Sequence, residues 1–298
     1  MVQEDPRRMI LVTGASSSPG FKILARLKAE GRDALGVYNQ HPVEWSVRWD
    51  LAKDPVGLLE QYKPDAVIHA AALGDVDKCE EDPALCHRVN AVVAREIARW
   101  CAKRGARLVY ISTDYVFPGD RGMYREEDPP RPVNYYGLAK LLGEEAVLAA
   151  GGVVVRVAWI YGLGPGRQNF GRTVVEKLSR GEEVRAVADQ WGSPTLNTLI
   201  GEAVAKLLTA DYSGILHAAG PRMSRYEFAL AIAEAFGLPK ELVKPIKMAD
   251  LSFKAPRPRD SSLDSSKAER MLGIPLSDVK YTLTIFKKEW EGRGHASS

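Results

Sequence analysis

The sequence predicts an α/β fold in which a doubly wound parallel sheet is covered by helices on both faces. Short apolar runs alternate with helical patterns through the first half of the chain. The apolar runs lack polar alternation, which indicates strands buried on both faces. A turn containing glycine also separates the first run from the first helical pattern. Right-handed helical crossovers between parallel strands account for all three observations.

The individual elements follow from the spacing of apolar residues. Compact runs rich in Val, Ile and Leu predict strands at 9–13, 34–38, 66–69, 107–112 and 153–157. Apolar residues at helical spacing predict helices at 21–27, 55–62, 83–103 and 135–148. Beyond a loop at 162–166, further helices are expected near 171–180, 198–208 and 226–236, with a basic, proline-rich loop at 254–260.

The composition excludes several classes of protein. The chain has 298 residues and a net charge of +3, which is too small to indicate nucleic acid or an anionic membrane as a partner. No apolar run is long enough to span a bilayer, and the first residues lack the apolar stretch of a secretory signal. We therefore expect a cytoplasmic protein. The scarcity of Asn and Gln, together with 18 Pro, favours a thermophilic source.

The chain has three cysteines, at Cys79, Cys86 and Cys101. Their spacing matches no zinc pattern, so no metal site is expected, and their odd number argues against a disulfide framework. We expect buried thiols. A bridge between Cys79 and Cys86 is the alternative, because disulfides occur inside the cells of hyperthermophiles.

The turn after the first strand has the features of a phosphate-binding site. Such a turn lets a pyrophosphate approach backbone N–H groups at the start of a helix. The middle glycine of the usual Gly-x-x-Gly-x-x-Gly spacing is replaced by Ser17, whose side chain either holds the pyrophosphate farther away or donates a hydrogen bond to it. A tight turn without a ligand is the alternative. The predicted dinucleotide contacts in this turn are Gly14, Ser16, Ser17, Pro19 and Gly20, with Pro19 suited to a first helical turn.

The end of the second predicted strand bears on the choice of cofactor. NAD-dependent enzymes usually have an acidic residue there, which binds the ribose 2′-hydroxyl. This strand ends at Tyr38 and Asn39 without an acid, which favours NADP, with NAD as the alternative. Arg48 could fold back towards this strand end. Asp50 and Leu51 lie where an adenine contact is expected, although Asp50 could instead mark the entry to a helix.

Tyr136 and Lys140 lie one helical turn apart, downstream of a strand that ends near Thr113. A phenol normally keeps its proton up to about pH 10, and a nearby ammonium is expected to lower the pKa of Tyr136. Such a tyrosine can exchange a proton with a carbonyl oxygen near neutral pH, and the Thr113 hydroxyl could hold that oxygen. These three residues are the candidate catalytic groups of a carbonyl reductase. The alternatives are a solvated Tyr–Lys pair and a threonine that caps a turn.

We expect residues 1–161 to form a dinucleotide-binding domain of the Rossmann type, with return segments near 184–219. Residues 162–298 are expected to form mainly a smaller substrate-binding lobe, partly interleaved with the sheet. The regular alternation of short apolar runs and helical patterns ends near this boundary, and no low-complexity linker divides the chain.

Several strings of residues point to one protein family. From about Met9 to Leu272 they are Ala70–Ala72, Ser112–Phe117, Tyr136–Lys140 running into Gly143-Glu144, Asp189–Thr195 and Arg257-Pro258. By these motifs the chain resembles the extended short-chain dehydrogenases/reductases, and among them the dTDP-4-dehydrorhamnose reductases. The resemblance implies bound NADP(H), with NAD(H) as the alternative, contacts from Ala70, Ala71 and Ala72 to the cofactor, and a homodimer.

The resemblance also implies a reaction, namely the reduction of a nucleotide-linked 4-keto-6-deoxysugar in dTDP-rhamnose biosynthesis. Tyr136 would donate a proton to the carbonyl oxygen, Thr113 would donate a hydrogen bond to it, and Lys140 would hold the nicotinamide ribose. The candidate substrate contacts are aromatic or polar residues near strand ends and in loops: Tyr115, Trp159, Asn169, Gln190, Arg257 and Arg259. The aromatic residues could instead belong to the core, and the arginines could be surface charges.

A second relative leaves the activity open. The chain also resembles the NADP-binding regulatory β subunit of methionine adenosyltransferase, through residues 124–128, 224–227 and 257–259. Because that relative retains a Tyr-x-x-x-Lys motif, the motif does not separate an enzyme from a regulatory subunit. A sugar-nucleotide epimerase of the same fold is a further alternative.

Overall fold

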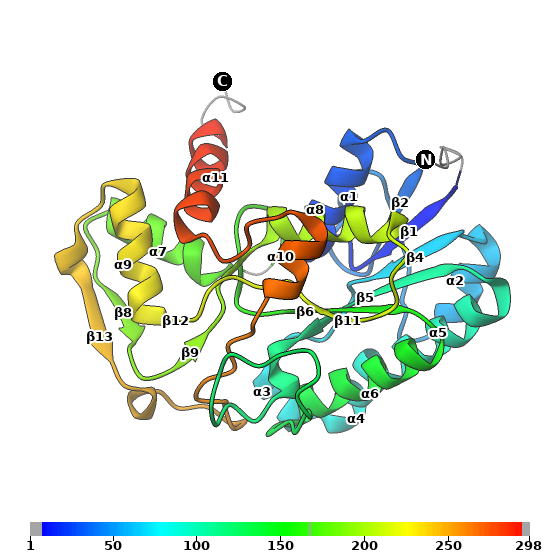
Figure 1. Ribbon diagram of the computed structural model, residues 1–298, viewed down its shortest axis with the longest axis horizontal. Coiled ribbons are helices and arrows are strands. Elements are labelled where there is room, and N and C mark those ends of the chain that lie inside the picture. Colours follow the sequence, from blue (N-terminus) through cyan, green and yellow to red (C-terminus); the bar gives the residue numbers. More distant parts are fainter. Residues whose placement is uncertain (1–7, 167, 294–298) are drawn as a thin grey trace.

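A sheet of seven parallel strands forms the centre of the computed structural model, which describes residues 8–166 and 168–293 (Figure 1). The strand order is β11-β6-β5-β4-β1-β2-β3, so the winding direction reverses between β1 and β4, and the predicted doubly wound sheet is confirmed. The strands are β1 Ile10–Thr13, β2 Ala34–Tyr38, β3 Ser46–Arg48, β4 Ala66–His69, β5 Arg107–Thr113, β6 Val153–Val157 and β11 Gly214–His217. The short strands β3 and β11, which were not predicted, extend the two edges.

Helices cover both faces of this sheet, as Figure 1 shows. Val109 and Ile111 of β5 pack towards one face, while Leu108 and Tyr110 pack towards the other, because successive strand residues point in opposite directions. The first face is covered by α1 Ser18–Ala29, α8 Asn197–Thr209 and α10 Ser266–Leu272. The second face is covered by α2 Pro55–Tyr62, α5 Val93–Arg104 and α6 Tyr135–Ala149.

The second lobe lies at the left of Figure 1. It contains α7 Phe170–Ser179, α9 Arg225–Phe236 and α11 Val279–Gly292, with β8 Val184–Val187 paired to β13 Val243–Ile246. Two further short pairs join β7 Ile160–Tyr161 to β10 Thr195–Leu196 and β9 Trp191–Gly192 to β12 Met223–Ser224. Within the predicted return stretch, β11 joins the main sheet and α8 packs against it, whereas β8 pairs with β13 of the second lobe. The boundary at residue 161 stays a prediction.

The helix predicted over 83–103 is interrupted. The structure has α3 Val76–Glu81, α4 Pro83–His87 and a π-helical turn at Arg88–Val92 before α5 begins. The Tyr110 hydroxyl donates to the backbone carbonyl of Asn90 at 3.1 Å, and the Asn90 side chain bonds the backbone N–H of Leu73 at 2.9 Å and its carbonyl at 3.1 Å. The Tyr110 hydroxyl thus bonds a backbone carbonyl within the π-helical turn, and the Asn90 side chain ties the same turn to Leu73.

The prediction of three buried thiols is correct for one cysteine. Cys101 is a buried free thiol, and burial raises its pKa to about 12. Cys79 and Cys86, however, form a disulfide. Their helices turn back on each other at Asp82, which caps α4, and this brings the two Cα atoms to 5.0 Å. The alternative of a Cys79–Cys86 bridge is therefore the correct one.

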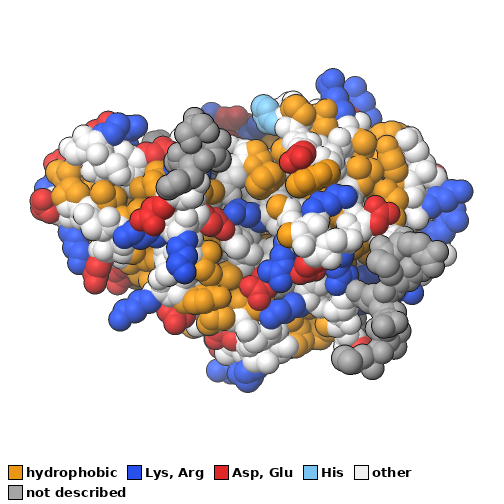
Figure 2. Space-filling view, turned by 90° about the horizontal axis from the view of Figure 1, so that it is seen from above, with side chains coloured by type: hydrophobic (Ala, Val, Ile, Leu, Met, Phe, Trp, Pro, Cys, Tyr) orange, Lys and Arg blue, Asp and Glu red, His pale blue; other side chains and the backbone are white. Residues whose placement is uncertain are grey.

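The surface carries charges of both signs. On the face seen in Figure 2, Lys and Arg side chains are interspersed with Asp and Glu, and hydrophobic groups lie between them. Among the described residues, no helix is both long and apolar enough to cross a membrane.

A buried ion pair fastens α6 to the sheet. The Glu144 carboxylate of α6 accepts hydrogen bonds from Arg156 of β6, at 2.6 Å from Nη2 and 3.0 Å from Nε. Ser112, which lies opposite Arg156 in the register of β5 and β6, donates to the same carboxylate at 2.5 Å. The pair therefore holds α6, and with it Tyr136 and Lys140, against the carboxyl end of β5.

We expect Glu144→Gln to lower the free energy of unfolding by about 3–5 kcal/mol, because Arg156 would keep an uncompensated buried charge. The matched control is Glu182→Gln, which removes the acid of an exposed pair with Arg180 and should change the free energy of unfolding far less. Urea denaturation followed by circular dichroism measures both. Equal effects of the two substitutions would contradict the structural role of the buried pair.

Candidate active site

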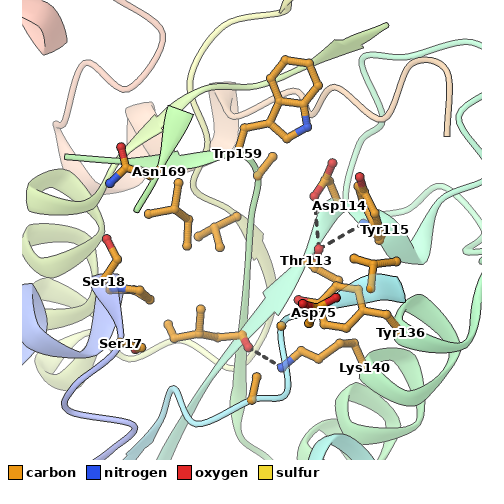
Figure 3. Close-up of a pocket in the computed structure, with 18 of the residues that line it drawn as sticks. Ser17, Ser18, Asp75, Thr113, Asp114, Tyr115, Tyr136, Lys140, Trp159 and Asn169 are labelled. Atoms are coloured by element: carbon orange, nitrogen blue, oxygen red, sulfur yellow. Dashed lines mark hydrogen bonds between the residues drawn. The ribbon is translucent and has the colours of Figure 1, made fainter. Parts of the chain in front are cut away.

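A cavity of about 960 Å³ opens at the carboxyl edge of the main sheet (Figure 3). Its walls include Ser17 beyond β1, Ala70 beyond β4, Thr113 at the end of β5 and Ala158 beyond β6. Open α/β sheets bind ligands at this edge, where the strand order reverses. The fold therefore places residues from four separate strands around one cavity.

The turn between β1 and α1 forms one wall and explains which of its glycines are necessary. Gly14 has a φ of +68°, and a Cβ atom there would lie 2.6 Å from the backbone nitrogen of Ala71. A Cβ atom on Gly20 would lie 2.2 Å from the Gly14 carbonyl oxygen. Ser17 has a φ of −79°, which any residue adopts, and its Oγ accepts a hydrogen bond from the Gly20 N–H at 3.1 Å. The serine is thus the N-cap of α1, and the turn keeps its shape without a third glycine.

The other predicted cofactor contacts fall into two groups. Pro19, Ala70 and Ala72 line the cavity with Ser17, as does Ser18, which was not predicted. Ala71 lies next to them, where its N–H donates to Thr13 Oγ1 at 3.3 Å. The remaining predicted residues lie outside the lining of this cavity. They are Ser16 in the turn, Asn39, whose carbonyl accepts from Arg48 Nε at 3.1 Å, Asp50, which bonds the N–H of Ala52 at 3.1 Å, and Leu51, which packs beneath the sheet. Arg48 does fold back to the end of β2.

Thr113 and Tyr136 meet on the opposite wall (Figure 3). Thr113 Oγ1 accepts from the Tyr115 N–H at 3.2 Å and donates to Asp114 Oδ1 at 3.1 Å. Tyr136 comes from the first turn of α6, which is capped by Asn134. The structure thus brings together two of the predicted catalytic residues from segments 23 positions apart.

The pKa of Tyr136 differs from the expectation. Burial raises it above its ordinary value, a hydrogen bond with Thr113 acts in the opposite direction, and the nearby Asp114 and Tyr115 raise it further. The predicted lowering by Lys140 is therefore wrong for the protein without ligands. Burial is the largest cause of the shift, because it disfavours the charged phenolate. The Lys140 ammonium donates to the Ile111 carbonyl at 2.7 Å. The phenol stays protonated, which is the form that a proton donor requires.

Lys140 is only 2% exposed, so a solvated pair on a helix surface is excluded. Its ammonium lies 3.9 Å from the centre of the Tyr110 ring. Burial lowers the pKa of Lys140 to about 7, although the Glu144 carboxylate acts against this shift. The amine therefore changes its charge near neutral pH.

A second cavity of about 330 Å³ adjoins the first, and three predicted substrate residues line it. Gln190 is buried in its wall and donates from Nε2 to the Pro258 carbonyl at 3.0 Å. Arg257 lines it as well and forms an ion pair with Asp77 at 2.9 Å. Tyr115 lines both cavities, so it connects this space to the catalytic wall.

Two of the three remaining predicted substrate residues, Trp159 and Asn169, line the larger cavity. Asn169 also caps α7, because its Oδ1 accepts from the Arg172 N–H at 3.1 Å. Arg259 is exposed, lines neither cavity and lies 5.9 Å from the centre of the Trp191 ring.

Asp114 and Arg225 are charged residues of the site that were not predicted. Asp114 is buried and accepts hydrogen bonds from Thr113 and Ser261, and burial raises its pKa to about 7. Arg225 begins α9 and lines both cavities. The only local signal near Arg225 is a capping box between Ser224 and Glu227, which marks the start of a helix without showing where the arginine points.

Comparisons with known proteins identify the family of this chain and several relatives. Residues 8–291 match the family model described as RmlD substrate binding domain. A dTDP-4-dehydrorhamnose reductase of Mycobacterium tuberculosis is 38% identical, with 86% of this chain and 84% of the relative aligned. The methionine adenosyltransferase 2 subunit beta of Pongo abelii is 33% identical, with 92% and 86% aligned.

A solved structure shows the same architecture with a cofactor. It is a dTDP-4-dehydrorhamnose reductase from Bacillus anthracis in complex with NADP, with a TM-score of 0.84 and 30% identity. The alignment covers 95% of this chain and 99% of that one. By its sequence over nearly the whole length, and by its fold, this chain belongs to the RmlD substrate binding domain family.

Proposed function

We propose that this protein is an NADPH-dependent reductase of a nucleotide-linked 4-keto-6-deoxysugar, and that it acts as a dTDP-4-dehydrorhamnose reductase. The observation that carries the proposal is the meeting of Thr113, Tyr136 and Lys140 in the cavity that also reaches the turn before α1. The similarity to the reductase of Mycobacterium tuberculosis supports it. The NADP complex of the Bacillus anthracis relative supports the choice of cofactor.

The residues around the cavity fit a nicotinamide dinucleotide. The space that Cβ atoms would fill at Gly14 and Gly20 leaves the backbone at the start of α1 open to a pyrophosphate. Ser17 could donate its hydroxyl proton to a phosphate oxygen, because its Oγ acts only as an acceptor within the turn. Lys140 would hold the nicotinamide ribose. When bound, NADPH supplies the hydride.

Tyr136 and Thr113 handle the oxygen of the substrate carbonyl. Tyr136 is protonated over the neutral pH range, so it can donate its proton to the oxygen as negative charge develops there. The Thr113 hydroxyl can rotate from Asp114 towards the same oxygen and donate a hydrogen bond. The Lys140 ammonium adds positive charge near this centre in its protonated form. These groups together perform general acid catalysis of carbonyl reduction.

The proposed function also includes the predicted contacts to the substrate and to the rest of the cofactor. We assign the sugar and its nucleotide to Tyr115, Trp159, Asn169, Gln190 and Arg257, all of which line one of the two cavities. For the adenosine half of the cofactor, Asn39, Asp50 and Leu51 stay predictions, as does Ser16. A position in the cytoplasm, a homodimer, a thermophilic source and the absence of nucleic-acid binding are likewise predictions from the sequence.

A regulatory subunit is the second candidate function. The identity of 33% to the methionine adenosyltransferase 2 subunit beta of Pongo abelii favours it. Such a subunit would bind NADP and a partner enzyme without turning over a sugar. Co-purification with methionine adenosyltransferase, together with no NADPH oxidation on sugar nucleotides, would support this function. An epimerase would instead retain its dinucleotide tightly through purification.

We expect Tyr136→Phe to lower kcat by about 100- to 10,000-fold, because the substrate oxygen would lose its proton donor. NADPH oxidation with dTDP-6-deoxy-L-lyxo-4-hexulose measures this loss, and the affinity for NADPH should change little. The matched control is Tyr135→Phe, since Tyr135 is the preceding residue and is 46% exposed. Robust turnover by Tyr136→Phe would exclude the acid role.

We expect the affinity for NADPH to weaken as the pH rises through about 7. Lys140 carries its positive charge below this pKa and loses it above, so its attraction to the anionic cofactor falls with rising pH. If the bound cofactor raises the pKa of Lys140 by about one unit, the dissociation constant should rise by about tenfold across the titration. Fluorescence titration at several pH values measures it. A profile unchanged in Lys140→Met would assign the pH dependence to another group.

A further inference from the structure

Arg225 occupies the junction between the two cavities. Tyr115, Phe170 and Arg225 line both of them, and Arg225 is the only cation among the described residues that does so. A nucleotide sugar whose C4 carbonyl lies at Tyr136 places its sugar in the larger cavity. The smaller cavity has the apolar side chains Ile246 and Leu251, with Phe253 beside them, which suit a nucleobase.

The connecting group of such a ligand must cross this junction. In a nucleoside diphosphate sugar, the diphosphate joins the sugar to the nucleoside, so it lies between the two cavities when both ends are seated. The other two residues common to both cavities, Tyr115 and Phe170, carry no positive charge. The negative charge of the ligand would thus fall where Arg225 is the shared cation.

The guanidinium of Arg225 is held in place without using its hydrogen-bond donors on the protein. Its central carbon lies 4.2 Å from the centre of the Trp159 ring and 5.0 Å from that of Phe170. It forms no ion pair or hydrogen bond with another residue in the described part of the chain. Stacking on aromatic rings fixes the plane of a guanidinium and leaves its edge N–H groups available.

The neighbouring charges differ from Arg225 in this respect. Asp114 attracts the guanidinium, but its two carboxylate oxygens already accept hydrogen bonds from Thr113 and Ser261. Arg257 in the smaller cavity is paired with Asp77. Arg185 is exposed to solvent, where water and salt screen its charge. Of these residues, Arg225 combines partial burial with unused donors.

We propose that Arg225 is the diphosphate-binding residue of the sugar-nucleotide site, and that it distinguishes nucleoside diphosphates from uncharged nucleosides. This inference rests on the proposed function and deepens it, because it names the substrate group that the junction recognises. Planar guanidinium groups bind two phosphate oxygens at once, which adds geometric selectivity to charge. The two aromatic rings near the guanidinium position it but do not themselves select an anion.

The test compares dTDP with thymidine by isothermal titration calorimetry on the full chain. The wild-type protein should bind dTDP more tightly than thymidine. Arg225→Leu should weaken dTDP binding by about 10- to 100-fold while thymidine binding stays within about twofold, because the lost contact is to a charged group. Arg225→Lys keeps the charge without the planar fork, so its affinity for dTDP should lie between those of the wild-type protein and Arg225→Leu. The matched control is Arg222→Leu, since Arg222 also stacks on a tryptophan, Trp191, at 4.8 Å but lines neither cavity.

The outcomes separate this inference from the proposed function. If the wild-type protein reduces the dTDP-linked keto sugar but Arg225→Leu keeps the preference for dTDP over thymidine, only the role of Arg225 is overturned. An equal loss of dTDP and thymidine binding in Arg225→Leu would also overturn it, since that result indicates a structural role. If the wild-type protein neither binds dTDP nor oxidises NADPH with the sugar nucleotide, the proposed function itself fails. Should Arg225→Leu not fold, Arg225→Gln takes its place in the same comparison.

Discussion

The buried pair of Glu144 and Arg156 is the interaction on which the geometry of the site depends. It joins α6 to β6 and, through Ser112, to β5, in a region from which water is excluded. Tyr136 and Lys140 precede Glu144 on the same helix by two turns and one turn, respectively. Because a helix is stiff over this length, anchoring Glu144 also sets where the phenol and the amine lie relative to Thr113. A charged pair at this position constrains orientation more sharply than apolar contacts, since its hydrogen bonds are directional.

Exclusion of water is the second general feature, because it sets the protonation of the catalytic groups. Burial raises the pKa of Tyr136 and lowers that of Lys140 to about 7, so each shift favours the uncharged form. Asp114 follows the same rule, with its pKa raised to about 7. A neutral phenol next to a carbonyl site suits reduction, in which the oxygen gains a proton. Lys140 is not among the groups that set the pKa of Tyr136, which burial dominates.

The two cavities connect the reaction to recognition of the substrate. The larger one contains the turn before α1 and the catalytic wall, and the smaller one lies between β8, β13 and the loop around Arg257. Residues of both lobes therefore surround the bound substrate in the proposed function. Tyr115 and Arg225 illustrate this, since one follows β5 of the main sheet and the other begins α9 of the second lobe.

The sequence by itself determined the parallel sheet, the turn from Gly14 to Gly20 and the alignment of Tyr136 with Lys140, because these depend on periodicity and on neighbours along the chain. Tertiary structure decided the rest. The disulfide of Cys79 with Cys86 required the reversal between two short helices. The cofactor turn accepts a serine at position 17 because the backbone there is extended. The protonation of Tyr136 and the placement of Arg225 depend on burial and on segments far apart in the sequence. Local patterns carry no information about those distant contacts, which form only when the two lobes pack together.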